Sequence, residues 1–130
     1  MPFPVDEKYI VATEQKLGVT FPASFRSKMI KENGGEVDTP PDTWQLFPFY
    51  DTSDKGRIKR TCNDIVRETA SAKQWAGFPS GAIAIGANGC GDKLVLMPSA
   101  PPTKLQDAVF WWDHETRQLH RICDDFAKLK

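Results

Sequence analysis

The most apolar part of the chain lies between Ala82 and Met97 and contains a cluster of glycines at its centre. The runs 82–85 and 93–97 are aliphatic and too short for helices, so they predict two strands. Three glycines and Asn88 between the runs supply the positive φ angles that a tight reversal or bulge needs. Neither run alternates between apolar and polar residues, which indicates that both faces are covered. We therefore predict a buried antiparallel hairpin at the centre of its sheet.

Two helices are predicted near the N-terminus. Asp6 can cap a helix over Glu7–Leu17, which ends at Gly18. Its apolar stripe is thin, so we expect it on the surface. Pro22 suits the first turn of a second helix, whose apolar face comprises Phe25, Met29 and Ile30. The sequence Asn33-Gly34-Gly35 ends this second helix.

The middle of the chain alternates between polar connections and short elements. Residues 36–43 are polar and contain proline, which predicts a loop leading into a strand over Trp44–Phe47 that Pro48 ends. Residues 51–60 predict a solvated loop, although four basic residues there also allow phosphate binding. Thr61 and Asp64 resemble a capping arrangement for a third helix, which ends before Gly77. Its predicted face comprises Ile65, Thr69, Ala72 and Trp75 or Ala76.

A second hairpin and a short helix complete the pattern. After a proline-rich loop over residues 98–106, Val109–Trp112 and Arg117–Ile122 predict strands that flank a turn at 113–116. Neighbouring strand residues point to opposite faces, so Trp111 and Trp112 cannot both enter one core. Either helices cover both faces or one indole is exposed. Asp124 is then expected to cap a final helix that docks through Phe126 and Leu129.

This order of elements predicts an α+β fold in which an antiparallel β-meander packs against about four helices. A length of 130 residues fits a single domain over 1–130. Seventeen basic and seventeen acidic residues give no net charge, which argues against a dedicated polyanion binder. The sequence has neither a basic, apolar leader nor a run of about 20 apolar residues. We therefore expect a cytoplasmic protein, monomeric or weakly dimeric, that binds neither membrane nor nucleic acid directly.

Sites for cofactors, metals or catalysis are weakly indicated. The three cysteines, Cys62, Cys90 and Cys123, are too widely spaced for a zinc knuckle or a disulfide framework. The glycine cluster is not a phosphate-binding loop, because it does not precede a helix and Asp92 beside it would repel phosphate. The better interpretation is that Asp92 bonds to the backbone amides of its own glycine turn. His114, His120 and their acidic neighbours match no standard metal spacing. No serine or histidine motif indicates acyl transfer. We therefore predict no enzyme, no cofactor and no metal.

Three stretches together resemble the SUKH superfamily, which comprises fungal cell-wall-synthesis regulators and bacterial immunity proteins. They are LGVTFPASFRSKMIKENGG over 17–35, IAIGANGCGDKLVL over 83–96 and VFWWDHETRQLHRICDDFAKL over 109–129. The resemblance spans nearly the whole chain. Relatives often carry a glycine in the last turn, where this chain has Arg117.

The resemblance implies a non-enzymatic binding domain without a shared catalytic set. In bacteria it implies an immunity protein that neutralises a cognate secreted or contact-delivered toxin, often a nuclease; the alternative is a regulatory or scaffold module of the cell-wall-regulator type. Exposed indoles anchor interfaces, and acidic side chains suit a basic nuclease. The C-terminal acidic group that could face such a nuclease comprises Asp107, Asp113, Glu115, Asp124 and Asp125. The predicted partner-binding residues are Trp44, Asp92, Trp112, Asp113, His114 and Glu115.

Overall fold

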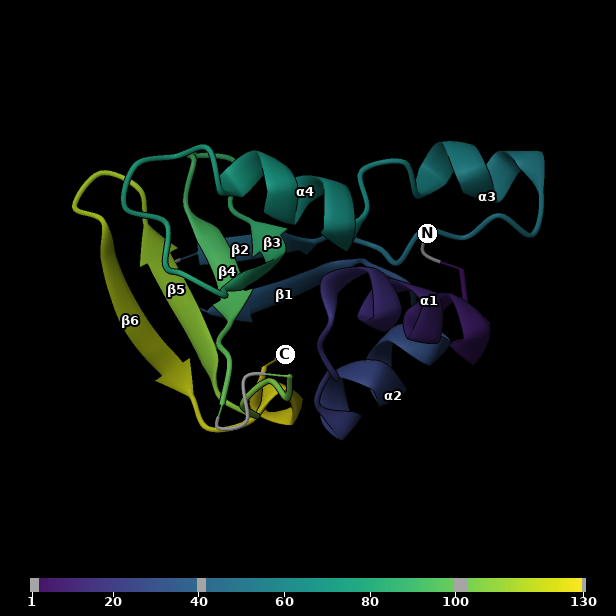
Figure 1. The fold of residues 1–130 in the computed structure, drawn as a ribbon, viewed down its shortest axis with the longest axis horizontal. Helices are drawn as coiled ribbons and strands as arrows, with labels where there is room; N and C mark the ends of the chain where they lie inside the picture. The colour runs from purple at the N-terminus through teal and green to yellow at the C-terminus, as the bar shows by residue number, and fades with distance from the viewer. Residues whose placement is uncertain (1–2, 40–41, 100–102, 130) are drawn as a thin grey trace.

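The structure is a computed structural model that describes residues 3–39, 42–99 and 103–129. Within these ranges six strands form one antiparallel sheet in sequence order, β1-β2-β3-β4-β5-β6 (Figure 1). The strands are β1 (Glu36–Thr39), β2 (Asp42–Leu46), β3 (Ile83–Ala87), β4 (Lys93–Leu96), β5 (Val109–Asp113) and β6 (Gln118–Cys123). The predicted α+β meander is therefore confirmed. The glycine-containing hairpin forms its two central strands.

In the described part of the chain, four α-helices and one 3₁₀ helix accompany the sheet. They are α1 (Glu7–Leu17), α2 (Ala23–Lys31), α3 (Lys55–Arg60), α4 (Ile65–Ala72) and η1 (Phe126–Lys128). The predicted bounds of α1 are confirmed, because the Asp6 carboxylate accepts a hydrogen bond from the Lys8 amide at 3.0 Å and Gly18 closes the helix at φ 69°. No helix among the described residues combines the length and the apolar character that a membrane span requires.

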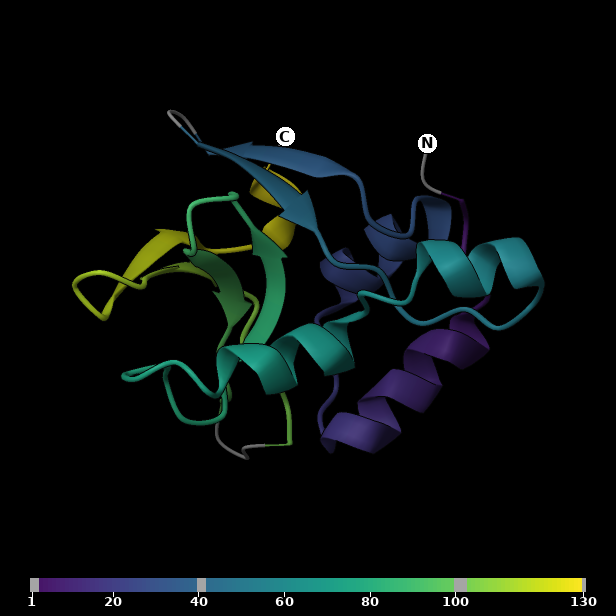
Figure 2. The same cartoon turned by 90° about the horizontal axis from the view of Figure 1, so that it is seen from above.

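The main core lies between the sheet and the helices. Figure 2 shows α1 and α4 running along the same side of the molecule, and these two helices contact each other. Aromatic rings join α2 to the segment after β2 and to the C-terminal 3₁₀ helix: Phe25 packs at 5.9 Å from Phe49 and at 4.9 Å from Phe126. All three rings are buried. The terminal 3₁₀ helix is therefore attached to the body of the fold by aromatic packing.

A second, smaller core covers the other face of the C-terminal strands. It contains Ala82, Val95 and Trp112, with partly buried Phe78 beside them. The ring of Phe78 meets the fully buried Trp112 edge-on at 5.1 Å. The connection after α4, residues 73–82, lies over this face. The sequence analysis expected either a helix or an exposed indole there, and a loop covers Trp112 instead.

Helix α4 protects an edge of β3 that β2 leaves unpaired. Strand β2 pairs with β3 only at the C-terminal end of β3, where Leu46 lies opposite Gly86 and Gln45 lies opposite Ala87. Alongside the start of β3, the Thr69 hydroxyl accepts a hydrogen bond from the Ala84 amide at 3.0 Å. Thr69 is 1% exposed. A side chain thus replaces a strand at this edge, so the backbone donor is satisfied without water.

Several predicted elements need correction. The predicted loop over 36–43 contains β1 and the start of β2, and Pro40 and Pro41 lie outside the described residues. The predicted loop over 51–60 contains α3, because the Asp54 carboxylate accepts from the Arg57 amide and caps a helix. By contrast, the predicted end of α2 at Asn33-Gly34-Gly35 is confirmed, because the helix ends at Lys31 with Glu32 as its C-terminal cap residue.

Two predicted caps and one predicted helix end also need correction. Asp64 alone caps α4 through its side chain, whereas Thr61 is the C-terminal cap residue of α3. Helix α4 ends at Ala72, so Trp75 lies beyond it. The cap of η1 is Asp125 rather than Asp124, because Asp125 accepts from the Ala127 amide at 2.8 Å. Phe126 is buried as predicted.

Candidate functional site

Two turns and one loop meet at one end of the sheet. Because β3–β4 and β5–β6 are successive antiparallel hairpins, the turns at 88–92 and 114–117 lie at the same end. The loop after α4 reaches this end, where Trp75 packs against Trp112 and His114. The predicted site residues from Asp92 to Glu115 are therefore brought together by strand pairing.

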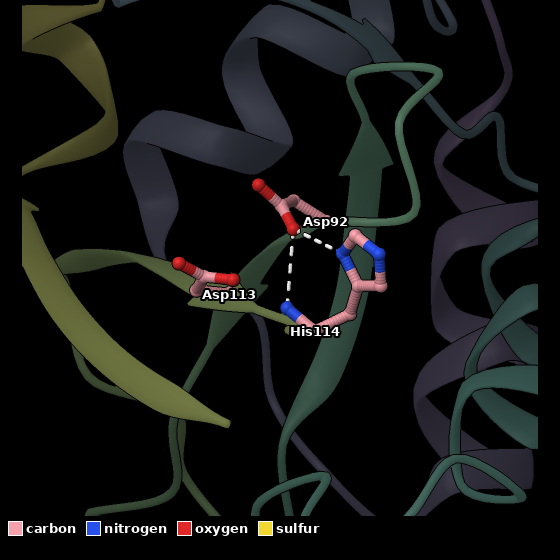
Figure 3. Close-up of side chains that lie close together, drawn as sticks. All are labelled: Asp92, Asp113 and His114. Carbon is pink, nitrogen blue, oxygen red and sulfur yellow. Dashed lines mark hydrogen bonds and ion pairs between the residues drawn. The ribbon is translucent and has the colours of Figure 1, made fainter. Parts of the chain in front are cut away.

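Asp92 is the centre of this cluster. Its Oδ1 accepts hydrogen bonds from the His114 amide at 3.1 Å and from His114 Nδ1 at 2.5 Å (Figure 3). Its Oδ2 accepts from the Trp111 indole N–H at 3.0 Å. Asp92 is 8% exposed, so these donors replace most of its contact with water. The carboxylate therefore fastens the β5–β6 hairpin to the β3–β4 turn.

These contacts set the charge of Asp92. Burial alone would raise the pKa of the Asp92 carboxyl, but hydrogen bonds from the His114 side chain and amide and from Trp111 outweigh burial and lower that pKa below its ordinary value. Asp92 is thus held as a carboxylate, and an ionised acceptor keeps a proton on Nδ1 of His114. The prediction that Asp92 bonds to the amides of its own glycine turn was wrong. Its backbone donor and its two shortest side-chain donors lie about 20 residues further along the chain, and from its own turn only the Asn88 side-chain amide donates to it, at 3.5 Å.

The same three side chains raise the question of a metal site. Asp92, Asp113 and His114 offer ligand atoms within 4.8 Å of one another. However, Asp92 Oδ1 and His114 Nδ1 lie at hydrogen-bond distance and point at each other (Figure 3). Asp113 Oδ1 accepts a hydrogen bond from the Glu115 amide at 2.9 Å. A tetrahedral ion with bonds of about 2.0–2.2 Å needs its ligand atoms more than 3 Å apart. The geometry favours hydrogen bonding over metal coordination.

His120, which the sequence analysis considered with His114 as a ligand, lies elsewhere. Its ring packs against Trp111 at 5.0 Å on neighbouring strands.

Trp75 is the exposed indole of this region. It is 46% exposed, and its ring meets the His114 imidazole edge-on at 5.5 Å. Trp112 and Trp44 are 0% exposed, so neither presents a surface to a partner, and their predicted place among the contact residues must be revised. Trp111 is partly buried and its N–H is bound to Asp92. Sequence reasoning placed Trp75 on the inner face of a longer helix, which is why it was missed.

The predicted acidic group does not form one surface. Asp113 and Glu115 lie at the β5–β6 turn, whereas Asp124 and Asp125 lie at the opposite end of β6. Asp124 pairs with Arg121 at 2.8 Å and Asp125 caps η1. Among these acids, Asp113 and Glu115 flank His114, which Trp75 contacts.

A cleft of about 660 Å³ lies at the α3 end of the molecule. Its lining includes Phe3, the α2–β1 connection, the end of β2, and Arg57 and Arg60 of α3. The two guanidinium groups lie over the Phe3 ring at 5.0 and 4.7 Å from its centroid. Sequence reasoning treated these basic residues as a solvated loop. The capping position of Asp54 was the signal that could have indicated an ordered helix.

Comparison with known proteins gives one match. The model of the SMI1 / KNR4 family (SUKH-1) matches residues 4–129. No curated protein and no solved structure matches the chain.

Proposed function

The chain belongs to the SMI1 / KNR4 family (SUKH-1), and from this premise we propose that it is an immunity protein that binds and neutralises a cognate protein toxin in the producing cell. The family match over residues 4–129 is the observation that carries the proposal. The superfamily includes immunity proteins and regulators that act by binding. The toxin is secreted or delivered by contact, and a nuclease is its expected class.

The contact surface that we propose is the hairpin-end surface, defined as Trp75, Asp113, His114 and Glu115. Trp75 supplies a half-exposed indole, which is the kind of side chain that anchors protein interfaces. Glu115 is exposed at the tip of the β5–β6 turn and suits a basic partner. Asp92 lies beneath this surface and acts by holding it in place.

Contacts within the protein position His114 and Trp75 of this surface. His114 is held by two hydrogen bonds to Asp92, and Trp75 is wedged against His114 and Trp112. A preorganised surface loses less conformational entropy on association than a mobile one. Occlusion of a toxin by such a surface requires no reaction by the protein itself. The mechanism is therefore steric and electrostatic blocking of the toxin.

The test is co-expression with the toxin encoded next to this gene. We expect cell survival and a complex in pull-down. Trp75→Ala should weaken binding by about 2 kcal/mol, or roughly thirtyfold in Kd. The matched control is Val11→Ala, since Val11 is 38% exposed but belongs to α1. Its effect should stay below about twofold.

Glu115→Lys gives an independent test, because the exposed Glu115 contributes little to folding. It should slow association with a basic toxin and make binding less sensitive to salt. Undiminished killing with no complex would refute the immunity role. A gene without a toxin neighbour would instead favour the regulatory or scaffold role that the same family includes.

A further inference from the structure

The connection after α4 covers the second core although it forms neither a helix nor a strand. We call residues 73–81 of this connection the strap. All of these residues are described and none of them is buried, yet they lie over the fully buried Trp112. Among the described residues, the second core beneath the strap has three buried members, namely Ala82, Val95 and Trp112. This face of the sheet is therefore closed by a single layer of irregular chain.

Aromatic rings hold the strap on the sheet. The Phe78 ring meets Trp112 edge-on at 5.1 Å, and the Trp75 ring meets Trp112 at 6.5 Å and His114 at 5.5 Å. The amides of Trp75 and Phe78 donate to carbonyls three residues earlier in the chain. Within the ranges that the structure describes, no hydrogen bond joins residues 73–81 to a strand. The strap can therefore leave the sheet without breaking a hydrogen bond to it.

The indole of Trp112 has a buried donor without an acceptor beneath the strap. Its Nε1 is inaccessible to solvent, and no acceptor among the described residues bonds to it. By contrast, the indole N–H of Trp44 donates to the Thr39 hydroxyl, and that of Trp111 donates to Asp92. A donor that loses water and gains no acceptor destabilises the state that buries it. Lifting the strap would relieve this penalty.

Two glycines give the strap points at which its backbone can bend. Gly77 and Gly81 lie on either side of Phe78 and have φ angles of 83° and 77°. Glycine changes between backbone conformations at little steric cost, which suits it to hinges. A Cβ at Gly77 would lie 2.9 Å from the Cβ of Arg117, so the closed position also requires glycine there. Closure thus depends on a close approach of the Gly77 backbone to the β5–β6 turn.

We propose that the strap opens and closes over Trp112 while the sheet stays folded. In the open form the rings of Phe78 and Trp75 leave Trp112, whose indole N–H then donates to water. The closed form predominates, because opening also exposes these apolar rings. The opening itself is independent of the immunity role. Its effect on a partner rests on the proposed function, because opening withdraws Trp75 from the hairpin-end surface.

Native-state hydrogen exchange of the ¹⁵N-labelled protein, followed by NMR, tests this opening. The exchange rates of the Trp112 indole N–H and of the slowest amides of β4 are measured at urea concentrations below the unfolding transition. Global unfolding exposes the whole chain and responds steeply to urea, whereas a local opening exposes little surface and responds weakly. We expect a Trp112 rate that is nearly independent of urea, while the β4 rates rise. A Trp112 rate that rises in parallel with the β4 rates would overturn the proposal.

Two alanine variants form a matched pair for the same measurement. Gly77 and Gly89 have similar φ angles of 83° and 85°, but a Cβ at Gly89 would meet nothing within 4 Å. Gly89→Ala strains the open and closed forms equally, so it should raise the β4 rates about tenfold and change the Trp112 rate less than about twofold. Gly77→Ala strains the closed form, so it should raise the Trp112 rate about tenfold. Equal rises of the Trp112 and β4 rates in Gly89→Ala, or an unchanged Trp112 rate in Gly77→Ala, would contradict the opening.

The link to binding is tested with the toxin encoded next to this gene. In a saturated complex the Trp112 rate should fall by at least about tenfold, because a partner that contacts Trp75 binds the closed form. A complex in which the Trp112 rate is unchanged would overturn this link. The absence of any complex would instead refute the immunity role, and the experiments on the free protein would still decide whether the strap opens.

Discussion

Replacing Asp92 with asparagine tests the central cluster with the smallest possible change of shape. Four donors converge on the two carboxylate oxygens of Asp92. The His114 amide and His114 Nδ1–H bind Oδ1, and the Trp111 indole N–H and, at 3.5 Å, the Asn88 side-chain amide bind Oδ2. An asparagine offers one acceptor oxygen and one NH₂ group. Whichever way the amide is turned, at least one of these donors faces another donor. Asp92→Asn therefore removes a hydrogen bond that cannot be recovered by rotating the side chain.

The expected loss of stability follows from these contacts. Leaving one buried donor unsatisfied costs about 1–3 kcal/mol, and hydrogen bonds to a charged acceptor are roughly twice as strong as neutral ones. The bonds that remain to the neutral amide oxygen are thus weaker as well. Together these effects give a decrease of about 2–4 kcal/mol in the free energy of unfolding. That is a large share of the roughly 5–15 kcal/mol by which a domain is stable.

Urea unfolding followed by tryptophan fluorescence measures this difference, and its pH dependence gives a second test. The folded-state pKa of Asp92 is lowered, so the stability it contributes is present above its unfolded-state pKa of about 3.9 and is lost as pH falls through the folded-state value. The difference between the natural protein and Asp92→Asn should be constant near neutral pH. It should shrink below about pH 4.

Asp107→Asn is the matched control, because Asp107 is exposed and precedes β5. It should change stability by less than about 0.5 kcal/mol. If Asp92→Asn had an equally small effect, or if its effect grew as pH fell, Asp92 would not be the ionised acceptor that we describe.

Three further substitutions test local features by the same urea assay. Thr69→Val leaves the Ala84 amide without its acceptor and should lower the free energy of unfolding by about 1–3 kcal/mol. An unchanged urea midpoint would show that water replaces the hydroxyl. Gly91→Ala should lower the free energy of unfolding by about 1–3 kcal/mol, because Gly91 has φ 102° and an added Cβ would lie 2.9 Å from the His114 ring. An unchanged stability would contradict this packing. Arg117→Gly should raise the free energy of unfolding by up to about 1 kcal/mol, because Arg117 has φ 61°, a conformation that strains a side chain but not glycine. A decrease would mean that the packing of the Arg117 side chain against Gly77 outweighs this strain.

The sheet was predictable because hairpins are local. Short apolar runs that flank turn residues determine β3–β4 and β5–β6, and both hairpins occur as predicted. Strand β1 was missed because its residues, Glu36–Thr39, are mostly polar and lead into two prolines. Its pairing with β2 buries only one of its four side chains, Val37. An edge strand of this kind leaves almost no periodic signal.

Helix α3 was missed for a related reason. Sequence patterns detect helices by an apolar face, and α3 has none, because caps and ion pairs hold it in place. The resemblance to relatives with a glycine in the last turn was informative at Arg117, where the backbone adopts the left-handed conformation that glycine favours.

The candidate site was predictable in its members but not in its contacts. The sequence indicated Asp92 and His114 separately, because each lies at a turn. Their bond depends on the register of β4 against β5, which pairs Lys93 with Trp112 and so brings the two turns together. The exposure of the tryptophans depends on where the loop after α4 runs, and no local pattern determines that path. Trp112, which strand alternation left as a candidate for exposure, is therefore buried, and Trp75, which was expected on a helix face, is exposed.

The hairpin-end surface and helix α3 lie at opposite ends of the molecule, with the β5–β6 turn at one extreme of the long axis and α3 at the other (Figures 1 and 2). Asp92 fastens the first, and Asp51 and Asp54 fasten the second. In both places a carboxylate is used to position neighbouring groups rather than to react. Zero net charge therefore does not mean an even distribution of charge, since the exposed Trp75 and Glu115 lie toward one end of the molecule and the basic helix α3 lies at the other.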